Sequence, residues 1–148
     1  MDPGNVQASK PPAVKVLLVE DDNLIQEMYE TILKLRNFEV ELASDGVEGL
    51  EKTRALKPDV ILLDVMMPKM NGLEMLEKLK NDPQIRDIPV IMLSNLADDE
   101  HIRQALSLGA LQYIIKSEHV PKEIADMVEQ TLASHNAKPP IDKNPLTD

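Results

Sequence analysis

Five short apolar segments recur along the chain, and each gives way to polar or charged residues. They lie at residues 14–19, 38–42, 60–63, 89–93 and 111–115. Short runs rich in Val, Ile and Leu are typical of strands that are buried on both faces, as in a parallel sheet. The segment at 38–42 instead alternates between apolar and polar residues, which indicates a half-covered strand at the edge of the sheet. We therefore predict five strands.

Five helices are expected between and after these strands, because apolar residues recur there at intervals of three and four. Three of them begin at residue pairs with the spacing of a capping box: Asn23 with Gln26, Asp45 with Glu48, and Asn71 with Glu74. The fourth ends at Gly109, and the fifth begins at Pro121. Strands that alternate with helices in this way predict an α/β fold, with a parallel sheet covered by helices on both faces.

The side chains that these helices turn towards the sheet can be predicted from the same spacing. Val47, Leu50 and Leu56 are expected to face the sheet from the second helix, and Leu106 from the fourth.

One domain is expected from the length of 148 residues, which suffices for a single proper core. Residues 1–12 are polar and rich in proline, and we predict a disordered leader there. The domain is expected to cover residues 13–134. Residues 135–148 are predicted to form a disordered tail, which has too few apolar residues for a further domain.

Charge and composition exclude several kinds of partner and site. The formal net charge of −10 at pH 7 disfavours binding to nucleic acid and to an anionic membrane surface. The chain has no cysteine, so disulfides and thiolate metal sites are excluded. No apolar segment has the length of a membrane span or the form of a secretory signal, so a cytoplasmic protein is expected.

Reactive side chains collect where the predicted strands end. These are Glu20, Asp21, Asp64, Ser94 and Lys116. The carboxyl ends of parallel strands share one edge of a sheet, which is where such folds bind ligands. Three carboxylates so close together are tolerable only with a cation among them, and hard oxygen ligands favour Mg²⁺. Asp64 on its own is equally typical of a turn residue, but in this setting it is placed to act as a nucleophile towards a phosphoryl group.

Five segments together resemble the response regulator receiver domain of two-component signalling. They lie at residues 17–22, 62–68, 71–72, 90–94 and 113–116, in order and with family-like spacing. The resemblance covers about residues 13–134. It implies a doubly wound, flavodoxin-like fold with the strand order 2-1-3-4-5. It also implies a signalling switch and not a metabolic enzyme, in which Asp64 accepts a phosphoryl group from a sensor histidine kinase or a histidine phosphotransfer protein.

The resemblance further implies roles for the metal-binding residues. Asp21 would bind Mg²⁺ directly, together with Asp64 and the backbone carbonyl of Met66. Glu20 would contact the metal largely through water.

The remaining site residues are assigned by the same resemblance. Ser94 and Lys116 would hold the phosphoryl oxygens, and Tyr113 would be the aromatic switch. Phosphorylation would then change the face made by the fourth helix, fifth strand and fifth helix, to which a downstream protein binds. Ser117 follows Lys116 where the family usually has proline, so the geometry of that loop is left open.

The lifetime of the phosphorylated state can also be predicted. Met66 and Leu96 lie two residues beyond Asp64 and Ser94, where the family tunes the access of water. Both side chains are apolar and cannot orient an attacking water, so we predict a long-lived acyl phosphate.

Two other functions remain open at this point. One is a receiver-like interaction module that takes no phosphate, against which the complete set of site residues argues. The other is an aspartyl phosphohydrolase, but such enzymes carry a second aspartate two residues on, where this chain has Met66. The sequence does not identify the kinase or the downstream target. It predicts a monomer or a weak dimer that depends on phosphorylation, and it fits either a stand-alone regulator or part of a larger protein.

Overall fold

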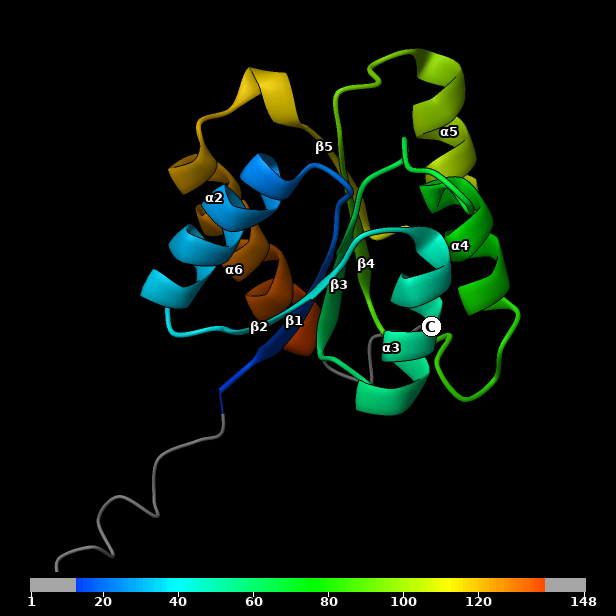
Figure 1. Cartoon of the computed structure of the whole chain (residues 1–148), viewed down its shortest axis with the longest axis horizontal. Helices are drawn as coiled ribbons and strands as arrows, with labels where there is room; N and C mark the ends of the chain where they lie inside the picture. The colour runs from blue at the N-terminus through cyan, green and yellow to red at the C-terminus, as the bar shows by residue number, and fades with distance from the viewer. Residues whose placement is uncertain (1–12, 138–148) are drawn as a thin grey trace, which may run out of the picture.

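The computed structural model describes residues 13–137, which form one parallel sheet between two layers of helices (Figure 1). The strands are β1 (Lys15–Val19), β2 (Glu39–Ala43), β3 (Val60–Leu63), β4 (Val90–Ser94) and β5 (Gln112–Ile115). All neighbouring strands are parallel, in the order β2-β1-β3-β4-β5. The predicted α/β fold and strand order are therefore confirmed. The predicted leader at 1–12 lies outside the described residues.

Five helices connect and follow the strands, as the sequence predicts. They are α2 (Asn23–Leu35), α3 (Gly46–Leu56), α4 (Gly72–Lys80), α5 (Asp99–Ser107) and α6 (Pro121–Ala137). Helices α2 and α6 cover one face of the sheet, and α3, α4 and α5 cover the other (Figure 1). Helix α6 begins at the predicted proline and continues past residue 134, and the tail beyond residue 137 is not described.

The core is divided by the sheet into two apolar layers. Leu17 and Leu63 pack with α3, α4 and α5, whereas Leu18 and Leu62 pack with α2 and α6. This division follows from the alternation of side chains along a strand. All four residues of β3 are buried, so the central strand is held from both faces and its carboxyl end has a fixed position.

Two predicted helix starts are capped as expected. The Asp45 side chain accepts a hydrogen bond from the backbone N–H of Glu48, over 2.8 Å. Asn71 and Glu74 form a complete capping box at the start of α4. Local spacing is sufficient for these caps because each bond joins residues that are only three positions apart.

The predicted capping box at the start of α2 is wrong. Asp22, with an extended backbone, is the N-cap and accepts from the backbone N–H groups of Leu24 and Ile25. Asn23 is already the first helical residue. The side chain of Gln26 turns into the interior, where it bonds to the ends of two strands.

The prediction that Val47 and Leu106 face the sheet is also wrong, since their exposed fractions are 41% and 47%. Leu56 is 40% exposed. In α3 the buried positions include Gly46 and Gly49, and these small residues let the helix lie close to its neighbours. Leu56 lies at the last turn of the helix and lines a pocket with Leu17 of β1 and Glu41 of β2, where it is only partly covered.

The helices among residues 13–137 include none that is both long enough and apolar enough to cross a membrane.

Candidate functional site

The strand register brings the predicted site residues to one edge of the sheet. Val19 pairs with Leu63, so Glu20 and Asp64 leave neighbouring strands side by side. The backbone N–H of Asp64 donates to the carbonyl of Val19 over 3.1 Å, which extends the ladder by one residue. On the far side of β3, Ser94 pairs with Ile115, and Lys116 follows directly.

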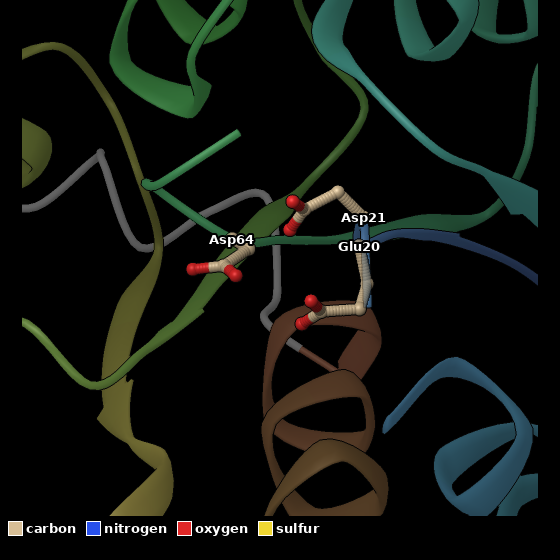
Figure 2. A group of neighbouring side chains, drawn as sticks. All are labelled: Glu20, Asp21 and Asp64. Carbon is tan, nitrogen blue, oxygen red and sulfur yellow. The ribbon is translucent and has the colours of Figure 1, made fainter. Parts of the chain in front are cut away.

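Three carboxylates form a compact cluster at this edge. Figure 2 shows Glu20 and Asp21 leaving the end of β1 in succession, with Asp64 beside them on β3. Each residue offers a carboxylate oxygen, and these oxygens lie within 4.8 Å of one another. Glu20 and Asp64 are buried, whereas Asp21 is exposed. The predicted convergence of these three residues is therefore observed.

Lys116 bridges the two buried carboxylates from the end of β5. Its Nζ lies 2.7 Å from Oε1 of Glu20 and 3.2 Å from Oδ2 of Asp64. Burial disfavours the charged ammonium, but the hydrogen bond to Glu20 and the negative charges of Asp64 and Glu20 outweigh it. The pKa of Lys116 is raised as a result, so the side chain is a stable cation at neutral pH.

The position of Glu20 is held from two directions. One carboxylate oxygen accepts from Lys116, and the other accepts from the backbone N–H of Asp22 over 3.0 Å. Burial, aided by the negative charge of Asp64, keeps the pKa of Glu20 raised although these two hydrogen bonds lower it. With both oxygens engaged, Glu20 is the least available of the three carboxylates as a direct ligand.

The donor set fits a hard divalent cation. Three carboxylates face one another and a single ammonium offsets part of their charge, which leaves room for further positive charge. Asp21 is the most accessible ligand, and Asp64 is the second. The backbone N–H of Met66 lies 3.4 Å from Oδ1 of Asp64, and the metal-binding role of the Met66 carbonyl stays a prediction.

The turn that follows Asp64 is tightly closed. The backbone N–H of Gly72 donates to the carbonyl of Val65 over 2.9 Å. A Cβ at Gly72 would lie 2.0 Å from the carbonyl oxygen of Asp64, so only glycine fits. The start of α4 therefore lies directly against the backbone of Asp64 and fixes its position.

The side chains of Ser94 and Tyr113 meet at the backbone of Leu96. Ser94 Oγ accepts from the Leu96 N–H over 3.2 Å, and the Tyr113 hydroxyl donates to the Leu96 carbonyl over 2.7 Å. Burial raises the pKa of Tyr113, so its hydroxyl remains a proton donor at neutral pH. Tyr113 is thus connected to Ser94 through one backbone residue and is not among the carboxylates.

The loop after Lys116, which the sequence leaves open, is a single 3₁₀ turn over Lys116–Glu118. Residues 13–137 contain no cis peptide bond, so Ser117 follows Lys116 through a trans bond. The Lys116 side chain still reaches both carboxylates.

One residue of the site region was missed by the sequence analysis. Gln26 is buried, and its side-chain N–H₂ donates to the carbonyls of Glu20 and Ala43. Its position three residues before Tyr29 and seven before Leu33 puts it on the buried stripe of α2. A polar residue in register with an apolar stripe is the signal that could have identified it.

The fold and the charged edge together define a receiver-type α/β domain. A family model for the response regulator receiver domain matches residues 16–129, and the chain belongs to this family. The receiver recognised from the sequence motifs is therefore confirmed.

Solved structures support the same assignment. The chain is 30% identical to the chemotaxis response regulator CheY4 of Vibrio cholerae, with a TM-score of 0.75, covering 81% of this chain and 99% of that one. A CheY-like receiver domain protein from Methanospirillum hungatei is also 30% identical, with a TM-score of 0.77, covering 85% of this chain and 98% of that one.

Curated relatives are longer proteins. The chain is 41% identical over 101 residues to hybrid signal transduction histidine kinase D of Dictyostelium discoideum, covering 68% of this chain and 6% of that protein. It is 33% identical over 125 residues to the DNA-binding response regulator MtrA of Mycobacterium leprae, covering 84% of this chain and 54% of MtrA. The chain thus spans about half or less of these two relatives.

Proposed function

We propose that Asp64 accepts a phosphoryl group from a phosphohistidine of a sensor histidine kinase or a histidine phosphotransfer protein. The observation that carries this proposal is the buried Asp64 carboxylate beside a lysine and two further carboxylates. These neighbours argue against the alternative that Asp64 is only a turn residue, because a turn aspartate at the surface needs none of them.

The transfer is a substitution at phosphorus. A carboxylate oxygen of Asp64 forms the new P–O bond while the P–N bond to the donor imidazole breaks, and the leaving imidazole takes up a proton. Lys116 already lies 3.2 Å from Asp64, so its ammonium is placed to neutralise a phosphoryl oxygen without large movement. Ser94 carries a hydroxyl proton that it can donate to another phosphoryl oxygen while its Oγ still accepts from the Leu96 N–H.

Asp21 and Asp64 would hold Mg²⁺, with the Met66 carbonyl as a further ligand and Glu20 acting through water. The bound ion supplies positive charge that offsets the repulsion between the carboxylates and the incoming phosphoryl group. Because Asp21 is exposed, an ion held there would be accessible from solvent.

The signal would leave the site through Leu96. A pull on Ser94 by the phosphoryl group acts on a backbone residue that also binds the Tyr113 hydroxyl. Tyr113 lies on β5, between α5 and α6, so its movement changes the face made by α5, β5 and α6. This is a local charge event that biases a two-state element, and a downstream protein would read it.

The acyl phosphate is expected to be long-lived. Met66, 61% exposed, and Leu96, half buried, follow Asp64 and Ser94 by two residues, and both side chains are apolar. Neither can orient a water molecule for attack on phosphorus. Radiolabel on the purified, phosphatase-free protein should therefore persist well beyond seconds, and its loss within seconds would contradict this part of the proposal.

The central experiment is labelling of Asp64 by a small phosphodonor with and without Mg²⁺. Intact mass spectrometry should show the gain of one phosphoryl group that requires Mg²⁺, is acid-stable and alkali-labile, and is abolished in Asp64→Asn. Asp59→Asn is the matched control, because Asp59 precedes β3 at its other end and its carboxylate accepts from the backbone N–H of Lys15, far from the site. Candidate kinases are then compared by phosphotransfer profiling.

Two outcomes would favour the other functions. Failure of Asp64 to be labelled in the presence of Mg²⁺ would indicate an interaction module that takes no phosphate. Turnover of small phosphate esters would indicate a phosphohydrolase.

A further inference from the structure

Gln26 is a buried polar side chain that the proposed phosphoryl transfer does not use. It lies in the first turn of α2 with only 8% of its surface exposed. Its Nε2 donates over 2.7 Å to the carbonyl of Glu20 and over 3.2 Å to the carbonyl of Ala43. The side chain therefore ties the helix to the ends of β1 and β2.

These hydrogen bonds hold the backbone on which the acidic cluster is built. The N–H of Glu20 also donates to the carbonyl of Ala43, over 2.9 Å. Both backbone groups of Glu20 are thus hydrogen-bonded: its N–H donates to Ala43, and its carbonyl accepts from Gln26. The peptide that joins Glu20 to Asp21 is fixed as a consequence.

Asp21 depends on this arrangement more than its neighbours do. No hydrogen bond from the described residues 13–137 holds the Asp21 carboxylate, which is exposed. The direction of its side chain is set by the two flanking peptides. Gln26 holds the one before it, and the Glu20 carboxylate holds the N–H of Asp22 after it.

We propose that Gln26 is a positioning residue for the metal site: it orients the Glu20–Asp21 peptide so that Asp21 presents its carboxylate to the cation. This inference rests on the proposed role of Asp21 and Asp64 in binding Mg²⁺. Removal of a group that orients a metal ligand without touching the metal commonly weakens metal affinity on the order of 10- to 100-fold.

A neutral amide suits this position for two reasons. Its N–H₂ group supplies two donors, one for each carbonyl. It also adds no charge beside three carboxylates. A glutamate there would turn an acceptor towards both carbonyls, whereas a methionine has a similar size and no donor.

The test compares Mg²⁺ binding by the full chain and by Gln26→Met, using isothermal titration calorimetry. We expect the dissociation constant to rise about tenfold, while the rate of Asp64 labelling at saturating Mg²⁺ stays within about twofold, since Asp64 and Lys116 are untouched. Amide hydrogen exchange at Glu20 and Asp22, whose N–H groups are bonded in the parent, should also be faster in the metal-free variant than in the metal-free parent. That readout does not involve activity.

Thr53→Val is the matched control. Thr53 is fully buried and its hydroxyl donates to the carbonyl of Gly49 inside α3, so the variant also loses a buried side-chain bond to a backbone carbonyl. It is expected to lower Tm and to leave the Mg²⁺ dissociation constant unchanged. If Gln26→Met does not fold, Gln26→Asn keeps the amide but shortens its reach, and it should weaken Mg²⁺ binding in the same direction.

The outcomes separate this inference from the proposed function. An unchanged dissociation constant in the folded Gln26 variant, with normal Mg²⁺ binding by the parent, overturns the positioning role alone. Absence of saturable Mg²⁺ binding by the parent itself overturns the proposed metal site and this inference with it.

Discussion

At the scale of single residues, the site is a set of charges that do not balance. Glu20, Asp21 and Asp64 bring three carboxylates together, and Lys116 is the one cation within reach among residues 13–137. Lys116 therefore holds together a group of side chains that would otherwise repel one another. Its removal leaves buried carboxylates without a partner.

Replacement of this lysine is the sharpest test at the residue scale. Lys116→Met should lower the free energy of unfolding of the metal-free protein by about 3 kcal/mol, because breaking a buried ion pair leaves an uncompensated charge. Urea unfolding in the presence of a chelator measures this loss. Lys122→Met, in the exposed first turn of α6, is the control and should be nearly neutral.

The stability difference between the parent and Lys116→Met should depend on pH in a defined way. The pKa of Lys116 is raised in the folded state, so its stabilising contribution is fully present below the unfolded pKa of about 10.4. It is lost as the pH rises through the higher folded value. The stability difference between the parent and Lys116→Met should therefore stay constant from neutral pH to about pH 10 and shrink above it. If the stability difference already shrinks at about pH 9, roughly a unit or more below the unfolded pKa, the raised pKa of Lys116 would be contradicted.

At the scale of elements, the turn between β3 and α4 positions Asp64. The start of α4 approaches the carbonyl of Asp64 so closely that a side chain at Gly72 has no space. Capping by Asn71 and Glu74 then fixes where the helix begins. The start of α4 and the end of β3 therefore pack together and are expected to move together.

Gly72→Ala should disturb this unit strongly. Its Cβ would meet a backbone oxygen at 2.0 Å, so we expect a loss of about 2 kcal/mol or more in unfolding free energy. Labelling of Asp64 should also slow, because the backbone of Asp64 has to move. Gly49→Ala is the control: its Cβ would meet the flexible end of Met75, which can shift. Equal effects of the two substitutions on labelling would refute the close approach as the cause.

At the scale of the whole molecule, the site lies at the point where the two halves of the sheet meet. Strand β3 is central, with β1 and β2 on one side and β4 and β5 on the other. The acidic residues directly follow β1 and β3, whereas Ser94 ends β4 and Lys116 directly follows β5. Binding at this edge therefore connects strands from both halves of the fold.

Mg²⁺ should accordingly stabilise the entire domain. At an ion concentration ten times the dissociation constant, binding to the folded state alone adds about 1.4 kcal/mol. For a domain of this size that corresponds to a rise in Tm of about 5 °C. Thermal unfolding with MgCl₂, against NaCl at matched ionic strength, measures it. Asp21→Asn should remove the rise, and a rise that persists in this variant would argue against the site.

Much of this protein could be predicted from the sequence because burial leaves a local pattern. The apolar run at 60–63 and the polar residue that follows it are enough to place Asp64 at a strand end. Caps such as Asn71 with Glu74 are equally local. The exposure of Val47 was not predictable in this way, because the glycines of α3 change how close the helix lies to its neighbours.

The sequence by itself determined the strands, the order of strand and helix along the chain, and which polar residues follow the strand ends. The tertiary structure decided which of these residues touch. The bond from Lys116 to Glu20 joins residues 96 positions apart, and those from Gln26 join a helix to two strand ends. Such contacts depend on the register of distant strands, which no local pattern specifies. For that reason the members of the site were evident from the sequence, but the residue that holds its backbone in place was not.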